Sequence, residues 1–199
     1  MSSLDQLASL ARRLNQAAGA PPLPALYFFT DPERTPDPVR AATRMPRGTA
    51  IVYRHFGAGD RIPTARRLAG ACGAHGLILL IAADPELARR VGADGVHWPE
   101  QRLPEQRTGD AHLVTASAHS LAGVARAAAF GADACVLAPV FPTRSSSGRT
   151  ALGLFRASQI ARAARIPVIA LGGVSAHTAR RLAGRGFAGF GAVDALLRA

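Results

Sequence analysis

The sequence predicts an α/β protein built as a single (β/α)8 TIM barrel with an N-terminal helix. Eight short apolar runs alternate with stretches of helical period rich in Ala, Arg and Leu, a pattern typical of a parallel sheet. The runs are almost continuously apolar, so helices are expected to cover the outside of the sheet. One turn pattern recurs between helix and strand, which indicates a repeated unit. A length of 199 residues fits one domain spanning residues 1–199.

Residues 1–25 are expected to form an amphipathic helix and its lead-in, because apolar residues recur there at helical spacing. These residues are Leu4, Leu7, Leu10, Ala11 and Leu14. Asp5, Arg12 and Arg13 are mixed among them, unlike the basic start and apolar block of a signal peptide. We therefore expect a cytoplasmic protein.

The eight strands are expected where β-rich apolar runs occur, and the helices where Ala, Arg and Leu recur with helical period. The expected strands are residues 26–30, 49–53, 76–82, 95–97, 113–117, 134–138, 167–171 and 187–191. The clearest helical stretches between them are residues 62–74, 121–130, 155–164 and 176–183.

A weak internal repeat supports the barrel. Residues 91–96 and 130–135 share a pattern of an apolar residue, Gly, Ala and Asp, and residues 72–77 and 185–188 are looser copies. In each copy a glycine follows a helix, where the left-handed backbone conformation costs it little. Eight such units close best into a barrel. An open doubly wound sheet is the alternative, but no G-x-G-x-x-G motif follows the first strand.

The net charge of +11 raises the question of nucleic-acid binding. All 24 basic residues are arginine, they are scattered in pairs along predicted helices, and no aromatic residues interleave with them. We therefore expect no nucleic-acid partner. No apolar run reaches the roughly 18 residues of a membrane span, so no membrane partner is expected either. Cys72 and Cys135 lie far apart and are expected to be buried, reduced thiols.

The ends of the strands supply the candidate site, because barrel enzymes place their active sites at the C-terminal ends of their strands. Arg54 and His55 follow the second strand, and Ser117 and His119 close the fifth. The polar loop after the sixth strand contributes Thr143, Arg144 and Ser145 as candidate substrate-binding residues.

Two small-residue turns after the last two strands are the candidate phosphate site. Gly172 and Gly173 follow the seventh strand, and Gly191 and Ala192 follow the eighth, with Ala192 opening a short terminal helix. A phosphate needs converging backbone N–H groups and small residues that let its oxygens approach. The alternative is that these residues only make tight turns.

From Leu26 to about Leu197 the chain resembles the thiamine-phosphate synthase and thiazole tautomerase family, which is a (β/α)8 barrel. The resemblance rests on L-Y-F-F-T-D at 26–31, G-A-D-G-V-H at 92–97, S-A-H-S at 117–120, P-V-F-P-T at 139–143 and I-A-L-G-G-V at 169–174. It implies that the two glycine turns hold the phosphate of a thiazole and that His119 occupies the position of a proton-transfer histidine. Histidine side chains ordinarily titrate near neutral pH, which suits that task.

The sequence departs from the synthase pattern at the opposite side of the pocket. Only Arg54 remains of the Q-x-R-E-K motif, Asp84 stands in place of N-D-R, and Arg102 falls near the second magnesium carboxylate. The lysine after the sixth strand is replaced around Ser145 or Ser146. We therefore expect no metal and no cofactor, with magnesium only if the synthase interpretation holds.

Three hypotheses follow. The favoured one is a metal-independent, tautomerase-like enzyme of thiamine biosynthesis that binds a thiazole phosphate, with His119 as the proton shuttle. The alternatives are a thiamine-phosphate synthase with an altered metal site, using Asp31 or Asp84, and a catalytically silent binder of a phosphorylated metabolite.

His97 is expected to be a packed histidine, while His55 is either a second acid/base group or a solvent-facing residue. A homo-oligomer is compatible with the sequence.

Overall fold

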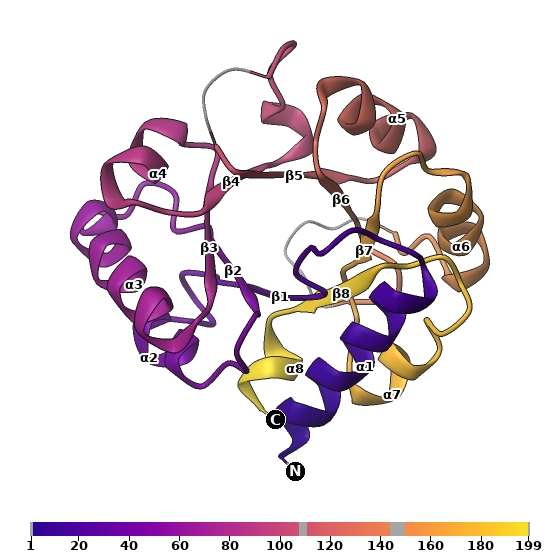
Figure 1. Ribbon diagram of the computed structural model, residues 1–199, viewed down its shortest axis with the longest axis horizontal. Coiled ribbons are helices and arrows are strands. Elements are labelled where there is room, and N and C mark those ends of the chain that lie inside the picture. The colour runs from indigo at the N-terminus through magenta and orange to yellow at the C-terminus, as the bar shows by residue number, and fades with distance from the viewer. Residues whose placement is uncertain (1, 108–110, 144–149, 199) are drawn as a thin grey trace.

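The chain closes a parallel sheet of eight strands into a barrel (Figure 1). This computed structural model describes residues 2–107, 111–143 and 150–198. The strands are β1 (Leu26–Phe29), β2 (Ala50–Tyr53), β3 (Ile78–Ala82), β4 (Gly95–Trp98), β5 (Leu113–Ala118), β6 (Ala134–Leu137), β7 (Val168–Ala170) and β8 (Gly189–Ala192). Each strand pairs with its neighbours in chain order, and β1 closes the barrel by pairing with β8. The predicted TIM barrel is confirmed.

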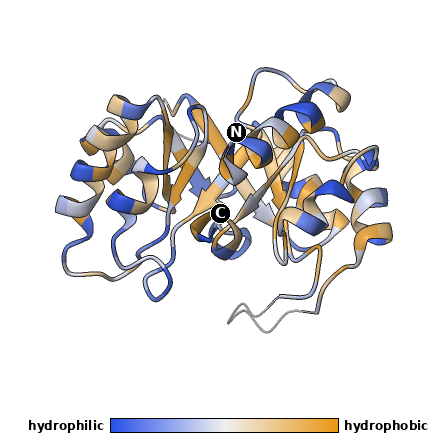
Figure 2. Cartoon of the chain, turned by 90° about the horizontal axis from the view of Figure 1, so that it is seen from below, coloured by the Kyte–Doolittle hydropathy of each residue, from blue (hydrophilic) through white to orange (hydrophobic). Residues whose placement is uncertain are grey.

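Helices surround the barrel, and one α-helix precedes it (Figure 1). The helices are α1 (Ser3–Ala17), α2 (Pro38–Thr43), α3 (Arg61–His75), α4 (Pro85–Val91), α5 (Leu121–Phe130), α6 (Leu154–Ala163), α7 (Ala176–Arg180) and α8 (Asp194–Leu197). In the described part of the β4–β5 connection, the only helical turn is a short 3-10 helix, η1 (Glu100–Arg102). Figure 2 shows apolar strands at the centre and polar residues on the outer faces of the helices. This pattern is expected for helices that bury one face against the barrel and expose the other to solvent.

The N-terminal helix α1 confirms the predicted amphipathic segment. Ser2 and Asp5 form a capping box, in which each side chain bonds to the backbone of the other residue. The buried face consists of Leu4, Leu7, Ala8, Ala11 and Leu14, whereas Leu10 is only partly buried. This face packs against β1, β8 and α7. No helix in the described ranges is long and apolar enough to cross a membrane.

The repeated turn has a structural explanation at the N-terminal end of the barrel. Gly92 and Gly131 end α4 and α5 in the left-handed conformation, with φ of 67° and 84°. The aspartates that follow them bond to the strand before: Asp94 accepts from the N–H of Leu79, and Asp133 accepts from the N–H of Val114, both at 2.7 Å. The repeat therefore fixes each new strand beside its predecessor.

The eighth strand begins two residues later than predicted. Phe187 and Ala188 belong to the turn before β8, and pairing with β1 starts only at Phe190, opposite Leu26. Ala192 consequently ends β8 instead of opening the terminal helix, which begins at Asp194. The third strand is likewise shorter than predicted, because Gly76 caps α3 with φ of 63°.

Candidate active site

A small cavity of about 120 Å³ opens at the C-terminal mouth of the barrel, between the ends of β1, β2, β7 and β8. Its lining is made by turn backbone, two arginines, one aspartate, one threonine and a few apolar side chains. The residues are Phe29, Arg34, Arg54, Thr143, Leu171, Gly172, Gly173, Val174, Ala192, Val193, Asp194 and Ala195. Five of the residues that we predicted to bind substrate or phosphate therefore line one cavity: Arg54, Thr143, Gly172, Gly173 and Ala192.

Gly172 and Gly173 form the floor of a tight turn after β7, where both have positive φ, 87° and 64°. A Cβ on Gly172 would lie 2.6 Å from the side chain of Pro139, and one on Gly173 would lie 2.3 Å from the carbonyl oxygen of Pro142. The turn therefore requires glycine for packing. It also leaves donors for a ligand, because no described residue accepts a hydrogen bond from the N–H of Gly172 or Gly173.

The prediction that Gly191 forms part of the phosphate-binding turn after the eighth strand is wrong. Gly191 lies inside β8, and a Cβ there would meet the ring of Phe29 at 2.8 Å. Gly191 does not line the cavity, because it packs against the ring of Phe29 within the barrel. Val193 and Asp194 line the cavity beside Ala192 instead. The one-turn helix α8 is too short to contribute a substantial helix dipole to this site.

Arg54 lies at the mouth as predicted, and Arg34 joins it. The Nε of Arg54 donates to the carbonyl of Thr30 at 2.9 Å, and its guanidinium lies 5.4 Å from the ring centroid of Phe29. Asp31 lies between the two arginines, 2.8 Å from Arg34 and 3.7 Å from Arg54. The hydrogen bond from Arg34 lowers the pKa of Asp31 to about 2, so this carboxylate is ionised. Sequence reasoning missed Arg34, although it follows Asp31 by only three residues.

On the other side of the mouth, Asp84 is held by protein groups. Its Oδ2 accepts a hydrogen bond from Arg61 at 2.8 Å, and its Oδ1 caps α4 by accepting from the N–H of Leu87 at 2.9 Å. Arg61 and Arg102 both lie over the ring of Phe56, at 5.6 and 4.9 Å from its centroid.

The residues of the described chain do not fit a magnesium ion at this mouth. Magnesium requires several hard oxygen ligands in octahedral geometry. Asp31 and Asp84 are each engaged by arginine, Arg102 stands near the position where the resemblance implies a carboxylate, and no group of three or more His, Cys, Asp or Glu side chains comes together within the described ranges. Guanidinium groups supply the positive charge here.

His119 lies at the C-terminal side of β5 but does not line the cavity. Its Nδ1 lies 2.5 Å from the carbonyl oxygen of Ala138, and its Nε2 lies 3.7 Å from Glu100. A carbonyl oxygen only accepts hydrogen bonds, so Nδ1 is the ring nitrogen of His119 that carries a proton. Glu100 is a partner that sequence reasoning missed; its position two residues after β4 was the available signal.

His97 is the packed histidine that the sequence predicted. Its Nδ1 lies 2.8 Å from the hydroxyl of Thr115, and its Nε2 lies 2.8 Å from the hydroxyl of Ser117. Burial lowers the pKa of His97 to about 3, so its imidazole is neutral. Ser117 is therefore bonded to His97, and its proposed contact with substrate stays a prediction.

His55 is buried, with 7% of its surface exposed, so the prediction of a solvent-facing residue is wrong. Its ring stacks on Tyr53 at 4.9 Å, and no described residue bonds to its Nε2. Burial lowers the pKa of His55, which favours the neutral ring. Two other predicted substrate-binding residues, Arg144 and Ser145, lie outside the described residues.

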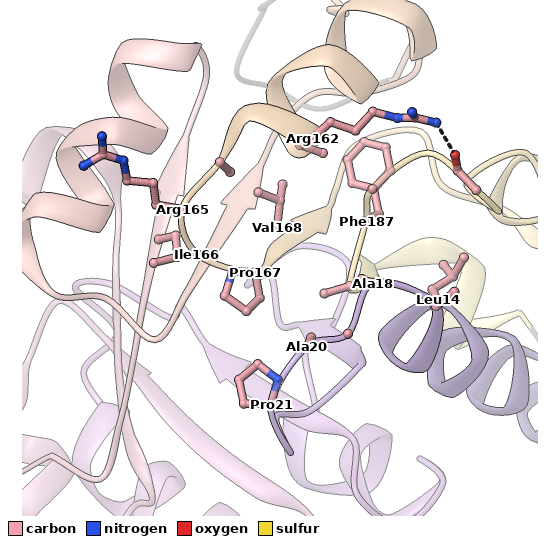
Figure 3. A pocket seen from close by; sticks show the side chains of 17 residues that line it. Leu14, Ala18, Ala20, Pro21, Arg162, Arg165, Ile166, Pro167, Val168 and Phe187 are labelled. Carbon is pink, nitrogen blue, oxygen red and sulfur yellow. Dashed lines mark hydrogen bonds between the residues drawn. The ribbon is translucent and has the colours of Figure 1, made fainter.

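A larger cavity of about 570 Å³ lies at the opposite, N-terminal end of the barrel, where the end of α1 meets the turns around β7 (Figure 3). The described residues that line it include Arg162 and Arg165 but no carboxylate, histidine or cysteine. Arg162 donates to the carbonyl oxygen of Gly184 at 2.6 Å. This cavity offers no acid/base chemistry and lies away from the end where barrels place their sites.

Known proteins match this chain over most of its length. The sequence profile of a family described as thiamine monophosphate synthase matches residues 26–196. A thiamine-phosphate synthase from Synechococcus sp. (strain WH7803) is 34% identical over 185 residues, 86% of this chain and 52% of the relative, so this chain spans about half of that protein. A thiamine-phosphate synthase from Bacillus velezensis is 30% identical over 189 residues, 88% of this chain and 84% of the relative.

Among solved structures, a thiamine phosphate pyrophosphorylase from Pyrococcus furiosus superposes with a TM-score of 0.72 and 27% sequence identity, and the match covers 87% of each chain. The family profile, the relatives and this fold all coincide over the same barrel. The chain belongs to the thiamine monophosphate synthase family.

Proposed function

We propose that the protein is a thiamine-phosphate synthase of thiamine biosynthesis, which joins a thiazole phosphate to a pyrimidine supplied as its diphosphate. The relatives with this name match most of the chain, and none of those described above is named a tautomerase. The observation that carries the proposal is the mouth cavity, where two arginines converge with two backbone N–H groups that no described residue accepts from. This replaces the tautomerase as the favoured function.

The reaction brings two anionic groups to one mouth, a phosphate that stays on the thiazole and a diphosphate that leaves the pyrimidine. Both need positive charge or aligned N–H donors in a site shielded from water. Gly172 and Gly173 offer the N–H donors, and Arg34 and Arg54 offer the charge at the same cavity. Arg61, whose guanidinium holds the carboxylate of Asp84 on the other side of the mouth, is a candidate for binding the leaving diphosphate.

The direct test is incubation of the purified protein with thiazole phosphate and pyrimidine diphosphate, with magnesium and with excess EDTA, followed by chromatography of the products. Formation of thiamine phosphate with release of diphosphate is expected. No product under any condition, with thiazole phosphate bound, would exclude the synthase and leave a binder of phosphorylated metabolites.

A second candidate is proton transfer on a thiazole carboxylate phosphate, with His119 as the shuttle. It is favoured by one observation, the carbonyl of Ala138, which holds Nδ1 and leaves Nε2 to exchange the proton. Conversion between thiazole tautomers in deuterium oxide, followed by NMR, tests it. Deuterium incorporation that persists in the His119→Asn variant would rule out this role.

A further inference from the structure

The charged groups at the mouth cavity form a continuous network of ion pairs that extends from the end of β1 to α8. Arg34 donates to Asp31 with Nη2 at 2.8 Å, and its Nη1 lies 3.5 Å from the carboxylate of Asp194. Arg54 approaches the same oxygen of Asp31 at 3.7 Å. Asp31 and Asp194 are far apart in sequence, and the pairing of β1 with β8 brings them together.

The two carboxylates that pair with Arg34 in this network differ in how firmly they are bound. Asp31 is the firmer partner: its other oxygen accepts the backbone N–H groups of Glu33 and Arg34, and 19% of its side chain is exposed. Asp194 is the looser partner, with 49% of its side chain exposed and a longer contact. Exposed ion pairs at such distances contribute little, so the Nη1 group of Arg34 is easily transferred to another anion.

Both Arg34 and Asp194 line the cavity that also contains the N–H groups of Gly172 and Gly173, from which no residue of the described ranges accepts a hydrogen bond. A phosphate monoester that accepts hydrogen bonds from these glycines therefore enters beside a guanidinium and a carboxylate. The guanidinium would gain a charge-assisted hydrogen bond from the phosphate, whereas the carboxylate would repel it.

We propose that Arg34 is a phosphate-binding residue that exchanges partners, from Asp194 in the free protein to the ligand's phosphate in the complex. Asp194 is thus an internal anion that competes with the ligand for Arg34, while Asp31 keeps Arg34 in place throughout. This inference rests on the proposed function, because it takes the mouth cavity to hold the thiazole phosphate.

A double-mutant cycle tests the exchange. Binding of inorganic phosphate and of thiazole phosphate is measured by calorimetry in excess EDTA, for the wild type, Arg34→Gln, Asp194→Asn and the double variant. Arg34→Gln is expected to weaken binding about tenfold to a hundredfold, the range of a charge-assisted hydrogen bond. Asp194→Asn is expected to tighten it about threefold to fivefold, and clearly less when Arg34 is already Gln, because only the direct repulsion between Asp194 and the phosphate is then removed.

The matched controls are Arg40→Gln and Glu33→Gln, which remove one charge each at exposed positions outside the cavity lining. Both are expected to change binding less than twofold, apart from general screening effects. Circular dichroism of each variant verifies that the barrel is folded.

Different failures have different meanings. If Asp194→Asn tightens binding equally with and without Arg34, Asp194 only repels the ligand and the exchange is refuted. Unchanged affinity in Arg34→Gln also refutes it while the phosphate site stands. If the wild type binds neither inorganic phosphate nor thiazole phosphate, the proposed site itself is overturned, and the exchange with it.

Discussion

His119 is held between two protein oxygens: its Nδ1 lies 2.5 Å from the carbonyl of Ala138, and its Nε2 lies 3.7 Å from the carboxylate of Glu100. Glu100 is in turn next to Arg126, whose guanidinium donates to the Glu100 carbonyl at 2.6 Å. The histidine therefore links the end of β6 to the turn after β4, and it is not among the residues that line the mouth cavity. This relationship separates the two candidate reactions.

His119→Asn is expected to lower kcat/KM for thiamine phosphate formation less than about tenfold, because a general acid or base contributes about a hundredfold or more. The asparagine amide can still donate to the carbonyl of Ala138, so folding is preserved. Product formation is measured by chromatography, with His177→Asn on the exposed surface of α7 as the control. A loss beyond a hundredfold would place His119 in the chemistry of the synthase.

Gly173→Ala is expected to destabilise the protein by roughly 1–3 kcal/mol more than Gly184→Ala. Both glycines have φ near +65°, so alanine costs backbone strain at either position. At Gly173 the added Cβ would also collide with the carbonyl oxygen of Pro142, 2.3 Å away. At Gly184 no atom lies within 4 Å of the added Cβ, so no collision adds to the strain. Urea unfolding of both variants gives the comparison. Equal losses would mean that the loop at Pro142 yields without cost.

His97 is expected to make the protein less stable as the pH falls. Its pKa is about 3 in the fold and about 6.5 in the unfolded chain, so below pH 6.5 only the unfolded state takes up the proton. The free energy of unfolding should therefore fall by at most about 1.4 kcal/mol per pH unit between about pH 6.5 and pH 3 from this group. His97→Gln should flatten that slope.

The slope is measured by urea unfolding at pH 7, 6 and 5, and it is compared within each variant because His97→Gln also loses hydrogen bonds. His75→Gln is the matched control, since His75 is exposed at the end of α3. Identical slopes in His97→Gln and the wild type would show that His97 takes up a proton within the fold.

Asp84→Asn is expected to leave the effect of magnesium on the protein unchanged, because Asp84 is already bonded to Arg61 and to the N–H of Leu87. Asparagine retains the cap of α4, so the cost should stay within about 1 kcal/mol. Thermal unfolding with magnesium chloride and with EDTA provides the measurement. A stabilisation by magnesium that disappears in Asp84→Asn would identify Asp84 as a metal ligand.

The sequence by itself determined the barrel, the amphipathic first helix and the turns between helices and strands. These features depend on local rules: apolar periodicity, and glycine at the left-handed end of a helix, as at Gly92 and Gly131. The repeated aspartates Asp94 and Asp133 were visible as a pattern for the same reason, since each acts on the strand immediately before it.

Only the tertiary structure decided the contacts at the mouth. Arg34 meets Asp194 because β1 closes against β8, and Glu100 meets His119 because the turn after β4 packs on the start of α5. The boundary of β8, and with it the place of Gly191 inside the barrel, was likewise set by pairing with β1. Such contacts join residues far apart in sequence, and no local periodicity encodes which side chains barrel closure will bring together.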